Sequence, residues 1–258
     1  MQAEPLVSVI RLTGAIGSAG RAQLNDQALA PLIERAFKRG KPKAVALVIN
    51  SPGGSPVQSS LISARIRRLA DEKKVPVYAF IEDVAASGGY WLACSADEIW
   101  ADRCSILGSI GVISATFGAA DFLSEHGLER RVYTAGKSKS QLDPFLPEKT
   151  EDVERLKVLL EEMHEAFKSH VTDCRGDKLD GEADLFTGEF WLGDKSVELG
   201  LADGIGHVVP KMKEVFGDKV RFAVYGDKKP WYQRIGMAFA KDVVAGLEER
   251  AAYARFGL

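Results

Sequence analysis

The sequence predicts an α/β fold with mostly parallel sheets flanked by helices. Short runs of β-branched and aromatic residues alternate with segments whose apolar residues recur at helical spacing, and this alternation is typical of strand–helix–strand units. One run, Ala44–Ile49, contains no polar residue, as in strands that are covered on both faces of a parallel sheet. At 258 residues, the chain is long enough to bury a full core.

Each element of the first half is predicted from local composition. The strands are rich in β-branched and aromatic residues, and the helices carry apolar residues three and four apart. Gly40, after the first helix, is a common stop signal. In chain order we expect strand Leu6–Leu12, helix Leu24–Lys38, strand Ala44–Ile49, helix Val57–Asp71, strand Val75–Ile81 and a helix from Ser87.

The second half continues the alternation with shorter strands. Its longest predicted helix carries a charged start and an inward apolar stripe, and a later short helix is closed by Gly200. In chain order we expect strands Glu98–Ala101 and Ile110–Ser114, helix Ala119–His126, strand Arg131–Thr134, helices Glu148–Thr172 and Asp194–Leu199, and strand Val220–Val224.

The C-terminal part differs in character from the rest. Between Trp231 and Leu247, large apolar residues recur every four positions, which predicts an amphipathic helix. The stripe suits packing on this chain or on a neighbouring subunit, and a peripheral membrane contact is the alternative because Trp and Tyr lie near Lys and Arg. We therefore expect one domain over residues 1–208 and an extension over 209–258.

The composition excludes several classes of partner and cofactor. The formal net charge of −2 gives no basis for nucleic-acid binding. Three scattered cysteines, Cys94, Cys104 and Cys174, form no CxxC pair, so we expect reduced thiols and no metal or other cofactor. The first residues, Met1–Pro5, lack the basic and apolar regions typical of a signal peptide, and no apolar run approaches the about 20 residues of a membrane span. We expect a cytoplasmic protein, or one peripheral at the inner membrane.

The segment Val75–Trp91 contains the best candidate for a nucleophile. A predicted buried strand breaks into Ala85-Ala86-Ser87-Gly88-Gly89, where every side chain is small. A substrate backbone can approach a serine in such surroundings closely, and the free N–H groups of a helix that begins there point toward the hydroxyl. Ser87 is therefore the predicted nucleophile.

A serine nucleophile also needs an oxyanion site and a base. Asn50–Gly54 ends a buried strand with two glycines after a proline, which exposes backbone N–H groups; Gly88 N–H is a second donor. None of the four histidines, His126, His164, His170 and His207, lies in a loop that suggests a general base. A Ser–His–Asp triad nevertheless stays open. The polar loop Ala135–Pro147 offers Lys137 and Lys139, and a lysine is a base only when burial or a like charge lowers its pKa.

Several motifs, in order, resemble the signal peptide peptidase A family of serine peptidases, family S49. The resemblance runs from about Leu6 to Val208 and does not cover the C-terminal stretch. The matching segments are Asn50–Gly54, Ala86–Tyr90, Ala96–Ile99, Gly108–Val112, Gly136-x-x-Lys139 and Gly193–Gly206.

The resemblance implies a Clp-protease/crotonase-like fold and a Ser–Lys dyad. Carried over by motif, Ser87 is the nucleophile, Lys139 the general base, and Ser109 the residue that orients the lysine. Gly54 and Gly88 hold the oxyanion. It also implies a homo-oligomer in which a short member such as this one takes its lysine from the adjacent subunit.

We therefore expect a serine endopeptidase that hydrolyses extended apolar peptides, such as signal-peptide remnants or unfolded polypeptide. Two alternatives stay open. One is a crotonase-like acyl-CoA hydratase or thioesterase, which would share the fold and the two-amide oxyanion site. The other is an inactive scaffold that binds a partner through the C-terminal helix.

Overall fold

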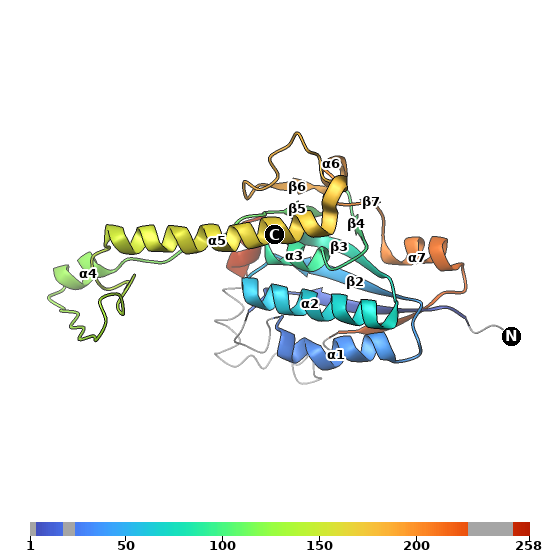
Figure 1. The fold of residues 1–258 in the computed structure, drawn as a ribbon, viewed down its shortest axis with the longest axis horizontal. Helices are drawn as coiled ribbons and strands as arrows, with labels where there is room; N and C mark the ends of the chain where they lie inside the picture. Colours follow the sequence, from blue (N-terminus) through green and yellow to red (C-terminus); the bar gives the residue numbers. More distant parts are fainter. Residues whose placement is uncertain (1–3, 18–23, 227–249) are drawn as a thin grey trace. The chain divides into compact units, whose positions relative to one another are not determined.

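A computed structural model describes residues 4–17, 24–226 and 250–258 (Figure 1). The chain divides into two compact units. The first comprises Met1–Gly111 together with Phe167–Leu258, and the second is the inserted segment Val112–Ala166.

The first unit is built on a sheet of eight strands in the described part of the chain. Their order is β6-β5-β3-β2-β1-β8, and β4 pairs with β3 and β7. All pairings are parallel except β5 with β6, which confirms the predicted fold class. The strands are β1 (Leu6–Thr13), β2 (Ala44–Ser51), β3 (Val77–Ala86), β4 (Glu98–Ala101), β5 (Ile106–Gly108), β6 (Phe190–Leu192), β7 (Gly204–Ile205) and β8 (Arg221–Tyr225).

Helices cover both faces of this sheet. Because side chains alternate along a strand, Val45, Leu47 and Ile49 of β2 pack under one set of helices, while Ala46 and Val48 face the opposite side. Helices α1 and α2 lie side by side over the first face (Figure 1), and α7 covers the second. The helices of both units are α1 (Asp26–Lys38), α2 (Pro56–Lys73), α3 (Gly88–Ala93), α4 (Ala120–Glu125), α5 (Thr150–Arg175), α6 (Gly193–Glu198) and α7 (Val208–Phe216), with a 3₁₀ turn at Gly176–Lys178.

Local sequence fixes the start of α1 and of α2. Asn25 caps α1 by accepting a hydrogen bond from the Ala28 amide at 2.9 Å. Ser55 caps α2, and Pro56 occupies the first helical position, where its missing N–H costs nothing. Helix α2 therefore begins immediately after the glycine pair that ends the β2 turn.

Two of the predicted strands are wrong. Ile110–Ser114 and Arg131–Thr134 have no strand assignment, although both have strand-like composition. The second unit contains α4 and the first part of α5, and no described strand. A β-strand needs a hydrogen-bonding neighbour, and local composition does not supply one.

The second unit buries little of itself. Asp152 is its sole buried residue, and α4 buries none. Its exposed large apolar side chains are those of Ile113, Phe117, Phe122, Leu128, Tyr133, Phe145, Val158, Leu159 and Met163. Burial of apolar surface is the main stabilising term in folding, so this unit lacks an interior of its own.

The predicted C-terminal helix, Trp231–Leu247, lies outside the described residues, and its role stays a prediction. Residues Arg250–Leu258 are described and begin in a helical turn. Within the residues that the structure describes, no helix has the length and apolarity needed to cross a bilayer.

Candidate active site

The ends of three parallel strands bring the predicted motifs of the first unit together. A register shift at the end of β2 sets Ser51 opposite Ala85 of β3. On the other side of β3, Ala86 lies opposite Gly108 of β5. The turn after β2, the serine after β3 and Ser109 after β5 therefore share one edge of the sheet, as the carboxyl ends of adjacent parallel strands do.

Ser87 occupies a strained turn between β3 and α3. Its φ and ψ are 51° and −121°, a conformation that costs a non-glycine residue about 1–3 kcal/mol and is concentrated at functional sites. Its amide donates to Gly108 O at 2.9 Å, and its carbonyl accepts from Trp91 N at 3.0 Å. Both neighbours fix the backbone, while the side chain stays half-buried at the surface.

Glycines allow the two turns to touch. A Cβ on Gly53 would lie 2.7 Å from Ala86 O and 2.8 Å from the Cβ of Ser87, closer than real side chains approach. A Cβ on Gly89 would collide with Ser51 O. Each turn thus occupies the space that a side chain on the other would need, which explains why glycines stand on both sides of the serine.

The same contact gathers two backbone donors. A Cβ on Gly88 would lie 3.4 Å from the Gly54 amide nitrogen, so the backbones of Gly54 and Gly88 are adjacent. Among the described residues, neither amide donates a hydrogen bond to an acceptor. Two adjacent amides with free N–H groups suit a developing oxyanion.

Ile16 holds this turn in place. Its amide donates to Gly53 O at 2.8 Å, and its carbonyl accepts from Ser55 N at 2.8 Å. The remaining space is closed by Ser59, which is fully buried and lies where a Cβ on Gly88 would be. Ile16 and Ser59 were not predicted from the sequence, because their contacts to the turn come from tertiary packing and leave no local motif.

Ser109 follows β5 in the left-handed region, with φ of 52°. Its amide donates to Glu189 O at 2.6 Å, and a Cβ on Gly108 would lie 2.9 Å from the Trp191 ring. The segment around Trp191 therefore packs closely against the Gly108–Ser109 turn.

The first unit's histidines are engaged away from Ser87. His170 stacks on Trp91 with ring centroids 4.4 Å apart, and burial lowers its pKa below the ordinary value. His207 lies 3.4 Å from Asp102. In the described part of this unit, neither ring hydrogen-bonds Ser87, so the geometry does not support a Ser–His–Asp triad.

Both candidate lysines belong to the second unit. Lys137 and Lys139 are exposed in the single chain, and the Lys139 amide donates to Gly136 O at 3.3 Å. The loop is braced by Asp143, which pairs with Arg130 at 3.0 Å. A backbone hydrogen bond from Phe145 N and the Arg130 side chain lower the pKa of Asp143. The pairing of Ser87 with Lys139 stays a prediction.

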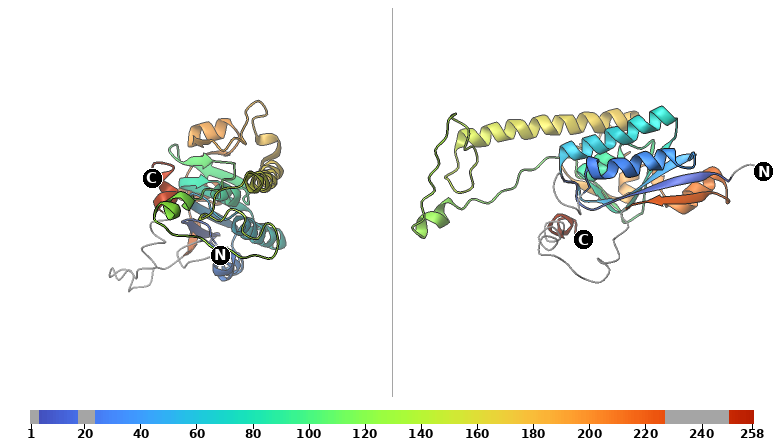
Figure 2. Two further views of the ribbon diagram at one scale, coloured as in Figure 1. Left: turned by 90° about the vertical axis from the view of Figure 1, so that its left-hand side faces the viewer. Right: turned by 90° about the horizontal axis from the view of Figure 1, so that it is seen from below.

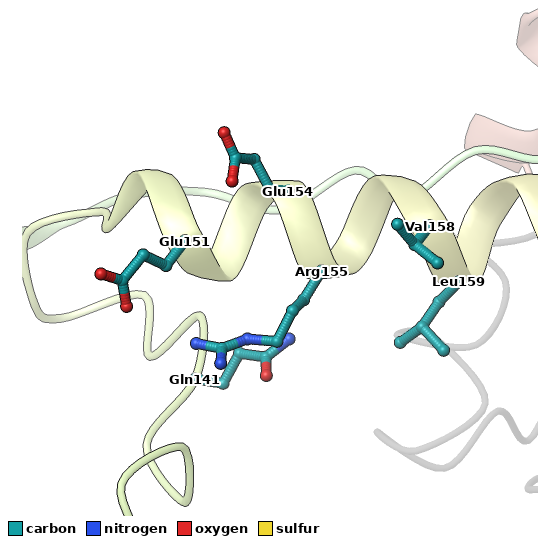
Figure 3. Close-up of a pocket in the computed structure, with 6 residues that line it drawn as sticks. All are labelled: Gln141, Glu151, Glu154, Arg155, Val158 and Leu159. Carbon is teal, nitrogen blue, oxygen red and sulfur yellow. The ribbon is translucent and has the colours of Figure 1, made fainter.

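A hollow of about 600 Å³ lies within the second unit (Figure 3). Figure 3 shows Gln141 beside Arg155, with Val158 and Leu159 farther along α5. Its lining residues are Gln141, Glu151, Glu154, Arg155, Val158 and Leu159. It includes none of the predicted catalytic residues, so the chemistry is not placed there. Within the described chain, no cluster of His, Cys, Asp and Glu could hold a metal ion.

Tyr90 joins α3 to the segment Gly200–Asp203, which also contains an ion pair. The Tyr90 hydroxyl donates to Leu201 O at 2.8 Å, and burial raises the pKa of Tyr90 well above its ordinary value. Asp203 accepts from Arg175 at 2.8 Å and from Ile99 N at 2.7 Å. Burial raises the pKa of Asp203, but these bonds and one from Lys178 outweigh it and leave that pKa lowered.

Comparison with known proteins identifies the family and supports the fold. The model of peptidase family S49 matches residues 69–215, more than half of the chain. A chloroplastic serine protease, SPPA, of Arabidopsis thaliana is 32% identical over 200 residues, covering 77% of this chain and 29% of that protein. The solved structure of a lysine-to-alanine mutant of the 1510-N membrane-bound stomatin-specific protease, in complex with a substrate peptide, matches with a TM-score of 0.53. At 11% identity, covering 95% of this chain and 99% of that one, it shows the fold.

A third relative carries a different name. A Na(+)/H(+) antiporter NhaA of Brucella melitensis biotype 1 is 46% identical over 274 residues, covering 99% of this chain and 37% of that protein. The chain thus spans about a third of the length of these two curated relatives, and the antiporter name describes a much longer protein. The family model spans Ser87, Ser109 and Lys139. The chain therefore belongs to peptidase family S49, the signal peptide peptidase A family of serine peptidases.

Proposed function

We propose that this protein is a serine endopeptidase in which Ser87 is the nucleophile and Lys139 the general base. One observation carries the proposal. Ser87 lies in a strained turn beside two adjacent amides, Gly54 and Gly88, that have no acceptor among the described residues. This arrangement can stabilise the negative charge that forms during acyl transfer.

In the proposed reaction, a neutral Lys139 amine takes the proton from the Ser87 hydroxyl as its oxygen attacks the substrate carbonyl. The carbonyl oxygen becomes an oxyanion that accepts hydrogen bonds from the Gly54 and Gly88 amides. Protonated Lys139 then gives its proton to the leaving amine, and the C–N bond breaks. Water attacks the acyl-enzyme by the same route and restores both residues. Ser109 orients the lysine.

The base requires a partner subunit. A lysine amine is neutral near pH 7 only where desolvation or a like charge lowers its pKa, and Lys139 is exposed in the single chain. The second unit also leaves its large apolar side chains exposed, Phe117 and Tyr133 at 92% and 90%. A second copy that covers this unit would bury those side chains and desolvate the lysine. We therefore propose a homo-oligomer with a site shared between subunits.

The proposed substrates are extended apolar peptides. The site lies at the carboxyl ends of the parallel strands β2, β3 and β5, the place where parallel sheets bind their ligands. The Ile16 side chain lies beside the oxyanion amides, 3.3 Å from where a Cβ on Gly88 would be, so an aliphatic group borders the reacting carbonyl. The related solved structure is described as a complex with a substrate peptide.

Fluorophosphonate labelling tests the proposal. We expect an adduct on Ser87 in the wild-type oligomer, none in Ser87→Ala, and a loss of at least about 100-fold in labelling rate in Lys139→Ala. Lys137→Ala is the matched control, because it removes an exposed lysine from the same loop and should label normally. Normal labelling of Lys139→Ala would reject Lys139 as the base. A wild-type protein without adduct would favour the inactive scaffold or the acyl-CoA enzyme, which turnover of an acyl-CoA thioester separates.

A further inference from the structure

The C-terminal residues Arg250–Leu258 pack beside the candidate active site, outside the region that the family model matches. Their aromatic side chains cover Val84, Ala86 and Ile106 on the sheet face opposite α1 and α2. Figure 2, right, shows the segment on that side of the sheet. Ala86 directly precedes Ser87, so the segment supports the strand end that holds the nucleophile.

Two aromatic residues make the contact. Phe256 packs edge-on against Phe190 of β6, with ring centroids 5.2 Å apart and an interplanar angle of 71°. The Tyr253 hydroxyl donates a hydrogen bond of 2.7 Å to the backbone carbonyl of Asn50. The two residues that this bond joins are separated by 203 positions in the sequence.

Asn50 connects β2 to the oxyanion turn. It lies at the register shift between β2 and β3, one residue before the segment Ser51–Gly54. Its carbonyl also accepts from Gly14 N at 2.9 Å, so Tyr253 and Gly14 use the two lone pairs of one oxygen. The Asn50 side chain donates to Asp83. Hydrogen bonds to Tyr253, Gly14 and Asp83 therefore fix Asn50, and with it the backbone that leads into Gly54.

We propose that Tyr253 is a positioning residue for peptide hydrolysis, which sets the Gly54 amide relative to Ser87 through its bond to Asn50. The inference rests on the proposed function. Tyr253 acts through the Asn50 carbonyl and touches no reacting atom. Because an oxyanion site works only when its donors are fixed before the reaction, a loosened Asn50 lowers the rate of acylation and leaves substrate binding unchanged.

The test compares Tyr253→Phe with Tyr225→Phe in the full chain. Tyr253→Phe keeps the ring that packs on the sheet and removes the hydroxyl donor. Tyr225→Phe removes a hydroxyl from another half-buried tyrosine, on β8. The measurements are kcat and KM on an unstructured apolar peptide, the rate of fluorophosphonate adduct formation at Ser87, and the melting temperature.

For Tyr253→Phe we expect kcat and the labelling rate to fall about tenfold, with KM within about twofold of wild type. The pH at which kcat is half-maximal should not move, because the base is untouched. The melting temperature should change no more than in Tyr225→Phe, which should keep wild-type kcat.

Three outcomes would overturn the inference: unchanged kcat and labelling in Tyr253→Phe, a rise in KM at constant kcat, or an equal fall in kcat in both variants. If Tyr253→Phe unfolds the protein, Phe256→Leu provides the second test, because it loosens the same segment while keeping the Tyr253 hydroxyl. It should lower the labelling rate with KM constant, and an unchanged rate would overturn the inference. A wild-type protein that forms no Ser87 adduct contradicts the proposed function itself.

Discussion

Gly53 and Ser87 are packed so closely that a single methyl group on Gly53 would lie 2.8 Å from the Ser87 Cβ. The contact joins the turn after β2 to the turn after β3, and it leaves the Gly54 and Gly88 amides next to each other. The geometry of the candidate site therefore depends on a missing side chain as much as on any side chain that is present.

Gly53→Ala should damage both stability and reactivity. The new methyl group would meet Ala86 O at 2.7 Å, and Gly53 has a φ of +98°, so we expect a loss of about 3 kcal/mol in the free energy of unfolding. We also expect loss of Ser87 labelling. Denaturant titration and fluorophosphonate labelling measure the two effects.

Gly217→Ala is the matched control for that variant. Gly217 has a φ of +87° with no heavy atom within 4 Å of the added Cβ, so it carries the backbone strain without the collision. Its stability should fall by about 1 kcal/mol with labelling intact. Equal effects in the two variants would show that the contact with Ser87 does not matter.

Mixing two inactive variants tests whether subunits share the site. Ser87→Ala and Lys139→Ala should each be inactive alone. If the lysine of one copy serves the serine of another, mixed oligomers contain some sites with both residues intact, and peptide hydrolysis returns after subunit exchange. Lys139→Ala mixed with itself is the control. If no activity returns although exchange is demonstrated by light scattering and labelled subunits, the site lies within one chain.

Asp203→Asn should lower the free energy of unfolding. Arg175, whose side chain is 2% exposed, would lose its carboxylate partner at 2.8 Å, and breaking a buried pair costs about 3 kcal/mol. The control Asp194→Asn breaks the exposed pair with Arg103 and should cost less than about 1 kcal/mol.

The effect of Asp203 should also depend on pH. Its pKa in the folded protein lies below the ordinary value of 3.8. As the pH falls below 3.8, the unfolded chain binds the proton first, so the stability that this carboxylate contributes is present above that pH and is lost below it. The difference between wild type and Asp203→Asn, measured by denaturant titration, should shrink in acid. A constant difference would contradict the assignment.

His170 should make the protein sensitive to mild acid. Burial lowers its pKa from an ordinary value of 6.5, so the unfolded chain binds a proton at a pH where the folded chain does not. Stability is therefore lost as the pH falls below 6.5 toward the folded pKa. His170→Phe, which keeps a ring beside Trp91, should lose less stability between about pH 7.5 and about pH 5.5. An equal loss of stability in wild type and in His170→Phe over this range would contradict the assignment.

Much of the fold and one half of the candidate site could be predicted from local sequence. The composition of Ala44–Ile49 specifies a strand covered on both faces, and β2 is buried along almost all of its length. The small residues around Ser87 predicted a turn that exposes a hydroxyl, and the structure has a strained turn there. The strand predicted over Ile110–Ser114 from its composition is wrong, because that segment has no strand beside it.

The amino-acid sequence by itself determined which residues can form a nucleophile and an oxyanion turn, since small side chains and positive φ angles are properties of single residues. Tertiary structure decided which turns meet. The register of β2 on β3 brings Gly53 onto Ser87, and Tyr253 reaches Asn50 across 203 positions. Such contacts arise from packing between distant segments, and a local pattern does not encode them. The proposed role of Lys139 depends on packing in the same way, because a lysine amine is a base near neutral pH only where burial or a like charge lowers its pKa.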